Sequence, residues 1–277
     1  MKRILTIQDI SCVGKCSLTV ALPILSACSL ETAVLPTAVL STHTMFKNGF
    51  TFHDLTGEIA PICEHWKREG LGFSCVYTGY LGSFEQLGLV SRLFDEFREE
   101  ESIYVVDPVM ADNGKLYPGF TPEFAAKMAG LCGKADVILP NLTEASFLLG
   151  IPYEPDPSPE RVRELLKMLC GLGAKIAVLT GVREKERELG VASYNSVTGE
   201  FFTYYNEHLP VTFHGTGDVF ASAVTGGLAR GLSIEKALPI AVDFTVESIR
   251  KTMADPQARS YGVNFEEALP MLMERIL

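Results

Sequence analysis

Short apolar runs alternate with longer amphipathic stretches along most of the chain. The short runs are rich in Val, Ile and Leu and are bounded by Gly, Pro, Asp or Asn. Such continuous apolar runs are typical of strands that are buried on both faces of a parallel sheet. The pattern predicts strands at residues 3–7, 32–35, 74–78, 103–106, 137–139 and 175–180.

Apolar residues at helical spacing separate these strands. The clearest helix begins after Ser158, with Pro159 at its first position, and Gly171 or Gly173 is expected to end it. Further helices are predicted over 84–100, 219–230 and 234–253. Two late strands, 189–194 and 200–205, flank a turn and predict a hairpin at the edge of a sheet.

This order of elements predicts an α/β fold, in which helices cover a mostly parallel central sheet. A length of 277 residues suits one large domain or two small ones. Internal repeats, low-complexity tracts and convincing linkers are absent from the sequence. We therefore predict a single domain over residues 1–277.

Charge and composition exclude several classes of function. The formal net charge of -10 argues against sequence-independent nucleic-acid binding, which needs a basic surface. No segment approaches the roughly 20 apolar residues of a membrane span. The start of the chain lacks the pattern of a signal peptide, and the seven cysteines are an odd number scattered through apolar stretches. Free thiols in the cytoplasm are the simplest interpretation.

The most informative residues are His214-Gly215-Thr216-Gly217-Asp218, which precede a helix-forming run. The two glycines allow tight backbone geometry, and the start of a helix presents free N–H groups and the positive end of its dipole. This combination stabilises phosphate oxygens and a transferring phosphoryl group. Asp218 is placed to accept a proton from an attacking hydroxyl. It is equally well explained as a helix cap.

Other nucleotide-binding patterns fail. The P-loop needs Gly-x-x-x-x-Gly-Lys-Ser/Thr, but Asp9 stands in place of the first glycine and Cys16 in place of the hydroxyl residue. No Gly-x-Gly-x-x-Gly follows the first strand, and the protein-kinase motifs are absent.

Taken with four other ordered segments, Gly215–Asp218 resembles the signature of the ribokinase-like superfamily, and more closely that of the pyridoxal kinases. The resemblance covers essentially the whole chain. The other segments are Ile7-Gln8, Ser41-Thr42-His43-Thr44, Thr78-Gly79-Tyr80-Leu81-Gly82, and Asp107-Pro108-Val109-Met110 with Pro140-Asn141-x-x-Glu144.

The resemblance implies a three-layer α/β/α domain with a small flap at about residues 40–52, and a homodimer. It implies an ATP- and Mg²⁺-dependent kinase that phosphorylates the 5'-hydroxymethyl group of a B6 vitamer (pyridoxal, pyridoxamine or pyridoxine). Asp218 would be the base, and Gly215, Thr216 and Gly217 the anion hole. ATP would contact Asp107, Asn141, Glu144, Thr180 and Gly181, with Asp107 and Glu144 near the metal. For Asn141 and Glu144, helix capping is the alternative, and for Thr180-Gly181 it is a turn that ends a strand.

The resemblance also implies acceptor-binding roles for Asp9, Ser11, His43, Thr44 and Tyr80. Tyr80 could stack on a pyridine ring or simply fill the core, and His43 could be an ordinary loop histidine. Asp9 departs from the family, in which a serine usually follows Ile-Gln, so Asp9 and Ser11 are rival contacts to the ring. Leu139 replaces the threonine that some members carry near a monovalent cation, so such a site would need backbone oxygens.

Two alternatives remain. A hydroxymethylpyrimidine kinase of thiamine biosynthesis shares the fold and the Gly-Thr-Gly-Asp motif, whereas the Gly-Tyr-Leu-Gly and Ser-Thr-His-Thr segments favour the B6 acceptor. A non-catalytic vitamer carrier would not need an intact Asp218 with its glycines.

Overall fold

A computed structural model of the protein describes residues 2–185 and 187–277. The chain divides into two compact units, one formed by Met1–Tyr77 with Leu209–Leu277 and the other by Thr78–His208. The single domain that the sequence suggests stays a prediction.

The first unit is built on the strands β1 (Arg3–Ser11), β2 (Glu31–Leu40), β3 (Phe52–Asp54) and β4 (Cys75–Thr78, whose last residue belongs to the second unit). Their order is β4-β1-β2-β3, with β1 and β2 parallel and β3 antiparallel to β2. Parallel pairing buries both faces, and accordingly Ile4, Leu5 and Ile7 of β1 have no solvent exposure.

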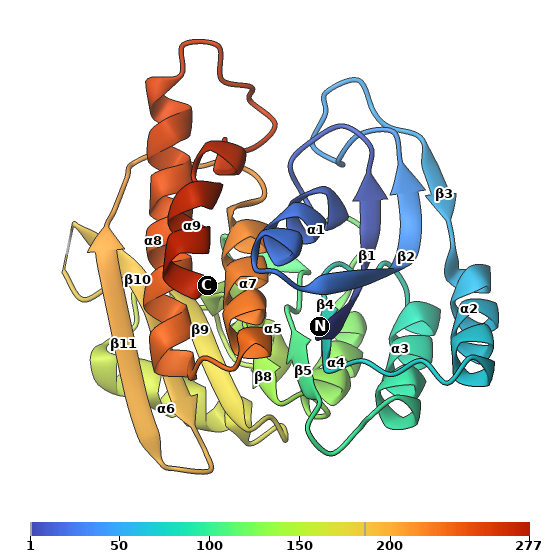
Figure 1. The fold of residues 1–277 in the computed structure, drawn as a ribbon. Coiled ribbons are helices and arrows are strands. Elements are labelled where there is room, and N and C mark those ends of the chain that lie inside the picture. The colour runs from blue at the N-terminus through green and yellow to red at the C-terminus, as the bar shows by residue number, and fades with distance from the viewer. Residues whose placement is uncertain (1, 186) are drawn as a thin grey trace. The chain divides into compact units, whose positions relative to one another are not determined.

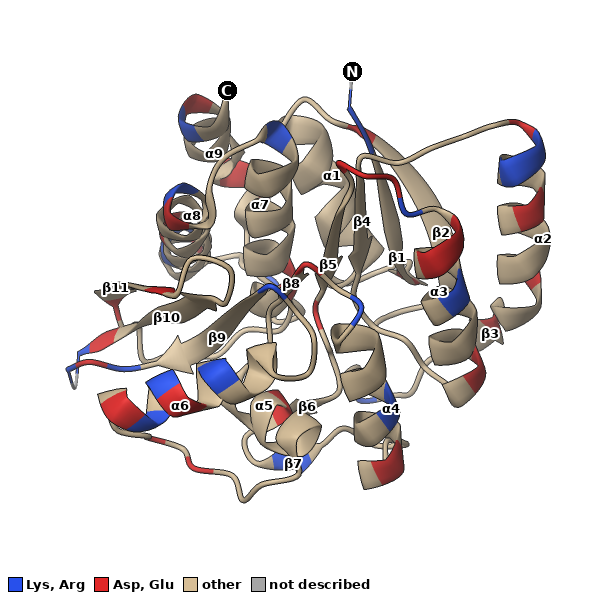
Figure 2. Ribbon diagram, turned by 90° about the horizontal axis from the view of Figure 1, so that it is seen from below, with Lys and Arg blue, Asp and Glu red and all other residues tan. Residues whose placement is uncertain are grey.

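Helices from both ends of the chain belong to this unit (Figure 1, blue and red). α1 packs on β1 and β2, α7 packs on α1, and α8 packs on α7. Figure 2 shows α7 free of charge along its middle, and this stretch, from Val219 to Ala229, is buried. The helices of this unit are α1 (Leu18–Ala27), α2 (Thr56–Arg68), α7 (Thr216–Arg230), α8 (Ile234–Ala254), the short 3-10 helix η1 (Phe265–Glu267) and α9 (Leu269–Ile276).

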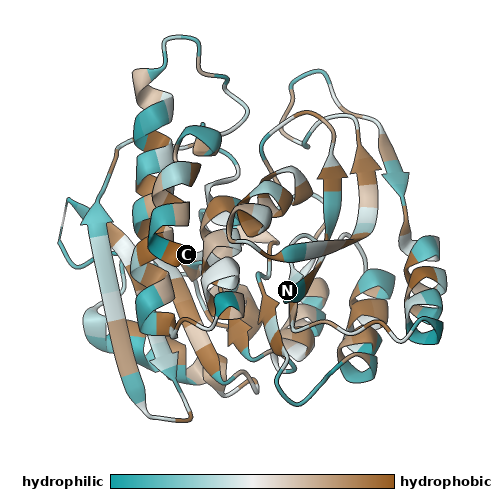
Figure 3. Ribbon diagram, in the orientation of Figure 1, coloured by the Kyte–Doolittle hydropathy of each residue, from teal (hydrophilic) through white to brown (hydrophobic). Residues whose placement is uncertain are grey.

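In the second unit the strand order is β11-β10-β9-β8-β5, with β5, β8 and β9 parallel and β9, β10 and β11 antiparallel. The edge strand β11 is pale teal in Figure 3, and most of its residues are partly or fully exposed. The strands are β5 (Ile103–Val106), β8 (Val137–Ile138), β9 (Ile176–Val182), β10 (Glu188–Asn195) and β11 (Glu200–Glu207), with a small separate hairpin of β6 (Ala111–Asp112) and β7 (Lys115–Leu116).

The helices of the second unit follow one another in space as they do in sequence. α3 contacts α4, α4 contacts α5, α5 contacts α6, and α6 packs on β9 and β10. Their bounds are α3 (Phe84–Glu96), α4 (Pro122–Cys132), α5 (Leu142–Leu149) and α6 (Pro159–Cys170).

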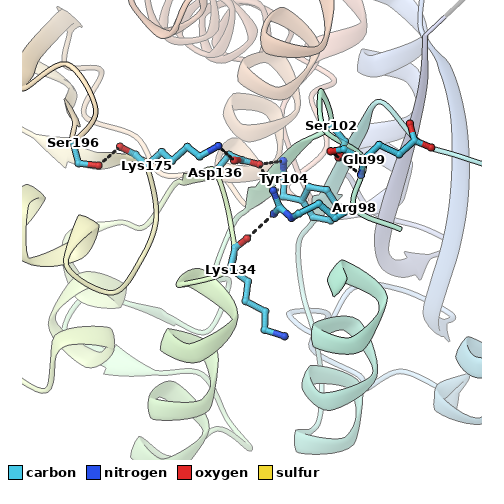
Figure 4. Close-up of polar contacts among 8 residues, drawn as sticks. All are labelled: Arg98, Glu99, Ser102, Tyr104, Lys134, Asp136, Lys175 and Ser196. Carbon is cyan, nitrogen blue, oxygen red and sulfur yellow. Dashed lines mark hydrogen bonds and ion pairs between the residues drawn. The ribbon is translucent and has the colours of Figure 1, made fainter. Parts of the chain in front are cut away.

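A buried aspartate holds the amino ends of three strands together in this unit (Figure 4). Asp136 forms ion pairs with Arg98 at 3.2 Å and with Lys175 at 2.8 Å, and it accepts a hydrogen bond from the Tyr104 N–H at 2.8 Å. Its own main chain bonds to Tyr104 and to Ile176. One residue therefore fixes the starts of β5, β8 and β9.

Most elements lie where the sequence predicts them. The strand 103–106, the late hairpin and the start of α6 at the Ser158 cap are confirmed. The predicted helix over 84–100 is wrong beyond Glu96, because a turn closed by Ser102 replaces its last residues; the Ser102 hydroxyl accepts the Glu99 N–H. β1 extends to Ser11, so Asp9 and Ser11 belong to a strand rather than to a loop. Within the described part of the chain, no helix is long and apolar enough to cross a membrane.

Candidate active site

The carboxyl end of β1 carries an irregularity that sets the direction of Asp9. The register between β1 and β2 is regular up to Gln8 and Pro36, and then Ile10 pairs with Val39, so β2 has one extra residue opposite Asp9. Pro36 has no N–H to continue the ladder, which favours a bulge here. Bulges next to active sites redirect side chains, and this one places Asp9 among polar neighbours.

Asp9 is buried, with only 4% of its surface exposed. The Ser11 hydroxyl donates to Asp9 Oδ2 at 3.1 Å, and the Ser17 side chain also hydrogen-bonds to the carboxylate. Burial raises the pKa of Asp9, and these two bonds partly offset the rise. The two rival candidates, Asp9 and Ser11, therefore form a single hydrogen-bonded pair.

The amino end of α7 is open to an anion. The cap residue Gly215 has a φ of 78°, in the left-handed region, and no side chain caps the helix. A Cβ on Gly215 would collide with the Lys15 carbonyl oxygen, whereas a Cβ on Gly217 would meet nothing within 4 Å. The main chain thus requires glycine at 215 and leaves free space beside 217, where helix N–H groups and the dipole favour phosphate oxygens.

Asp218 lies in the first turn of α7 and keeps partial solvent access. Its Oδ2 accepts a hydrogen bond from the Ser17 main-chain N–H at 3.0 Å. The pKa of Asp218 is raised to about 7, first by loss of hydration and then by the negative charge of Asp9, against the opposing effect of the Ser17 bond. A carboxylate with a pKa near neutrality is suited to accept and release a proton.

The loop between β1 and α1 connects these parts and is held by the C-terminal segment. Lys15 N–H donates to the Tyr261 carbonyl at 3.1 Å, and Lys15 Nζ reaches Asn264 Oδ1 at 3.1 Å and Glu266 Oε2 at 2.8 Å. Cys16, the next residue, has its pKa raised by burial and then by the charges of Asp218 and Asp9. Its thiol therefore stays protonated and is no nucleophile at neutral pH.

Among the residues of the Ser-Thr-His-Thr segment, His43 is buried and Thr44 is exposed. His43 Nδ1 accepts the Met45 N–H at 3.1 Å, and the His43 ring lies 5.4 Å from that of His214. Burial, and then the charge of His214, lower the pKa of His43. His43 is thus a neutral ring next to the residue that precedes the glycine loop, and the predicted flap, residues 40–52, leads from β2 into β3.

In the second unit, Asn141 and Glu144 form the capping box that was the alternative interpretation. Asn141 Oδ1 accepts the Glu144 N–H at 2.8 Å, and Glu144 Oε2 accepts the Asn141 N–H at 2.9 Å. Glu144 Oε1 also accepts the Met110 N–H at 3.2 Å. Burial raises the pKa of Glu144 to about 8, against these bonds, and the charge of Asp112 adds to the rise.

Two carboxylates of this unit are the candidate ligands for a divalent cation. Among residues 2–185 and 187–277, no group of three or more His, Cys, Asp or Glu side chains is arranged to hold a metal. However, two carboxylates lie near one side chain, the Cys132 thiol. The pKa of this thiol is raised first by burial and then by the charges of Glu144 and of the buried Asp107. Mg²⁺ usually takes one or two carboxylates and keeps several waters, and two acids meet that need.

Of the remaining candidates in the second unit, Thr180 and Gly181 lie within β9 near its carboxyl end, so the strand does not end at a turn there, and Tyr80 follows β4. Thr180 donates its N–H to the Pro140 carbonyl at 3.0 Å and pairs with Asn141 in an isolated bridge. Gly181 follows with a φ of 77° and is exposed. The half-buried Tyr80 ring lies 5.6 Å from that of Phe120. Asn141, Thr180 and Gly181 are therefore neighbours, and Tyr80 packs against Phe120.

Sequence reasoning missed the loop residues that support Asp218, namely Lys15, Cys16 and Ser17. The side-chain contacts of Lys15 span 249 residues of sequence or more, and no local pattern reports them. The only available signal was Gly14-Lys15-Cys16, which resembles a P-loop fragment and fails as one.

Solved structures identify the fold as that of the pyridoxal kinases. The pyridoxal kinase of Lactobacillus plantarum superposes with a TM-score of 0.91 at 32% identity, covering 99% of this chain and 97% of that one. A candidate phosphomethylpyrimidine kinase from Bacteroides thetaiotaomicron, crystallised with pyridoxal, gives 0.93 at 40% identity, covering 98% and 95%. The expected α/β fold and the resemblance to pyridoxal kinases are thus confirmed.

The family follows from the sequence match. The phosphomethylpyrimidine kinase family matches residues 50–262, and this chain belongs to it. The pyridoxine kinase of Bacillus subtilis is 31% identical over 188 residues, and the match spans 66% of each chain, just under two thirds of that enzyme's length.

Proposed function

We propose that the protein is an ATP-dependent kinase that phosphorylates the hydroxymethyl group of a B6 vitamer. The observation that carries the proposal is the Asp218 carboxylate, with a pKa near neutrality, at the uncapped amino end of α7. A base beside an anion site is what transfer of a phosphoryl group to a hydroxyl requires. The fold of the pyridoxal kinases supports the same activity.

In this mechanism Asp218 takes the proton from the acceptor hydroxyl as the oxygen attacks. The N–H groups of the Gly215–Gly217 segment hold the oxygens of the moving phosphoryl group, and the α7 dipole offsets their charge. Ser17 keeps Oδ2 of Asp218 occupied, which leaves Oδ1 for the acceptor. Asp9, with Ser11, would bind a donor group of the acceptor ring, because a carboxylate makes its strongest hydrogen bonds to charged or polarised donors.

Phosphate and metal chemistry would involve the second unit. We propose that Asp107 and Glu144 hold Mg²⁺, largely through water, and that Asn141, Thr180 and Gly181 contact the nucleotide. Bound Mg²⁺ would offset charge on the ADP leaving group. Tyr80, His43 and Thr44 remain proposed contacts to the acceptor.

The family name gives a specific reason to test hydroxymethylpyrimidine as a second candidate acceptor. Phosphomethylpyrimidine kinases act in the same family, and a hydroxymethylpyrimidine presents the same primary alcohol to the base. Pyridine and pyrimidine rings differ in their nitrogen positions, so the Asp9–Ser11 pair would bind them differently. The identity of the acceptor is therefore decided by measurement.

Product formation tests the proposal directly. Purified protein is incubated with Mg-ATP and, separately, with pyridoxal, pyridoxamine, pyridoxine and hydroxymethylpyrimidine, alongside Asp218→Ala. We expect a B6 5'-phosphate from the wild type that is lost in the variant. If only hydroxymethylpyrimidine were phosphorylated, it would be the acceptor in place of a B6 vitamer, and the proposed mechanism would stand. Vitamer binding without any product would overturn the kinase and favour a carrier.

A further inference from the structure

Ser17 has a backbone conformation that its side chain disfavours. Its φ is 52° and its ψ is -131°, a region that is open to glycine and costly for other residues. The residue is also buried. Strain of this kind persists only when surrounding contacts impose it, and it is concentrated at functional sites. The contacts of Ser17 therefore indicate what its conformation achieves.

The surrounding loop imposes this conformation through contacts on both sides of Ser17. Before it, Lys15 is bound to Tyr261, Asn264 and Glu266. After it, the Thr19 hydroxyl donates to the carbonyls of Gly14 at 3.0 Å and Cys16 at 2.8 Å. The Ser17 carbonyl accepts the N–H groups of the first turn of α1. With both flanks fixed, the peptide that enters Ser17 has little freedom to rotate.

The result is that Ser17 contacts two acids, the buried Asp9 and the partly exposed Asp218. Its main-chain N–H points at Asp218 Oδ2, 3.0 Å away, and its side chain hydrogen-bonds to Asp9. A glycine would adopt this backbone more easily, but it would lack the group that reaches Asp9. Serine therefore makes two contacts here, of which a glycine would keep only the main-chain bond to Asp218.

We propose that Ser17 is a positioning residue that orients the Asp218 carboxylate by directing a constrained main-chain N–H at Oδ2. The inference rests on the proposed function, in which Asp218 is the base. In this proposal the positive φ of residue 17 contributes more to the orientation of the Asp218 carboxylate than the Ser17 hydroxyl does. A residue that can keep φ positive should preserve the base, and one that cannot should lose it.

Two substitutions separate these possibilities. Ser17→Gly removes the hydroxyl but accepts a positive φ, so the N–H stays on Asp218. Ser17→Val introduces a β-branched side chain that strongly disfavours positive φ, so the N–H turns away. Ser29→Val is the matched control, because Ser29 is a serine of the same unit with a φ of 57° at the end of α1. It should lose stability by the same mechanism without touching Asp218.

The readouts are kcat and the titration of Asp218. We expect Ser17→Val to lower kcat by about tenfold or more, since misplacement by about 1 Å can cost 10²-fold, and Ser17→Gly to lower it distinctly less. Carboxyl-carbon NMR of labelled aspartate, with Asp218 assigned through Asp218→Asn, should show a higher Asp218 pKa in Ser17→Val, because the N–H bond favours the charged form. Asp9 and Cys16, the titratable groups whose interaction with Asp218 is evident here, are followed in the same spectra and by thiol titration.

The control variant should match the wild type in both readouts. The proposal is overturned if Ser17→Val and Ser29→Val have the same kcat and the same Asp218 pKa, or if Ser17→Gly loses as much activity as Ser17→Val. If Ser17→Val does not fold, a rise of the Asp218 pKa in Ser17→Gly still contradicts the proposal, because the glycine should keep the main-chain bond to Oδ2. A wild type inactive on every acceptor would refute the proposed function alone, because the NMR titration needs no turnover.

Discussion

Two aspartates at strand ends and helix starts show how surroundings decide the role of one residue type. Asp136, in the second unit, has two cationic partners and a main-chain N–H (Figure 4). Asp218, in the first unit, has one N–H, and its neighbouring charge is the like charge of Asp9. A carboxylate balanced by cations stabilises a fold, whereas Asp218, whose pKa is raised by burial and then by the charge of a second acid, can exchange a proton.

The first prediction removes Asp218, which has no cationic partner among the residues that the structure describes. Asp218→Asn should lower kcat by about 10²–10⁴-fold, the usual contribution of a general base. The free energy of unfolding at pH 8 should not fall, because the amide removes a charge that burial disfavours. Kinetics and urea denaturation measure the two effects. Asp243→Asn, which loses the surface pair with Arg275 in the same unit, is the control and should keep kcat.

The second prediction concerns the other unit, where removing an aspartate should lower the stability and leave kcat unchanged. Asp136→Ala leaves the buried Tyr104 N–H without its side-chain acceptor and removes both ion pairs, so the free energy of unfolding should fall by about 1–3 kcal/mol. The kcat of folded protein should stay unchanged. Asp95→Ala, which breaks an exposed pair with Lys134, should cost less than about 1 kcal/mol. Equal losses in the two variants would remove the structural role given to Asp136.

The third prediction concerns pH. With a pKa of about 7, Asp218 is protonated in mildly acidic solution, so kcat should rise as the pH passes through 7. Its folded pKa exceeds the ordinary value of 3.8, so its contribution to stability is complete below that value and is lost as the pH rises through 7. The stability of Asp218→Asn relative to the wild type should therefore increase between pH 5 and about 8. A difference that stays constant over this range would contradict the raised pKa.

The two regions also differ in how far the sequence predicts them. Strand positions and the α6 cap follow from apolar runs and capping residues, which are local signals. The Gly-Thr-Gly-Asp segment was found because glycine at a tight turn is a local requirement as well. The Asn141–Glu144 pair was also readable, but as a capping box, and the structure contains the cap while the nucleotide role stays a prediction.

What the sequence could not supply is the set of long-range and conformational contacts. The β2 residue opposite Asp9 shifts the register, and no property of Asp9 itself reports that shift. Ser17 looks like an ordinary helix cap, yet its side chain makes no capping bond and its φ is positive. Lys15 reaches residues near the other end of the chain. These features depend on tertiary packing, so they become visible only in three dimensions.

The smallest expected effect tests whether Lys15, two residues before Ser17, serves the loop or the acid. Lys15→Met keeps an apolar stem near Phe265 but loses the bonds to Asn264 and Glu266. If the lysine fixes only the loop, the free energy of unfolding should fall by about 1 kcal/mol or less, and amide exchange should quicken around Tyr261. The activity should drop far less than in Asp218→Asn. Lys185→Met, which breaks an exposed pair with Glu188, is the control and should leave exchange at Tyr261 unchanged. If Lys15→Met lost as much kcat as Asp218→Asn, the lysine charge would act on the reaction itself. The contrast between Asp218, a base without a described cationic partner, and Asp136, a structural acid with two, would then no longer hold.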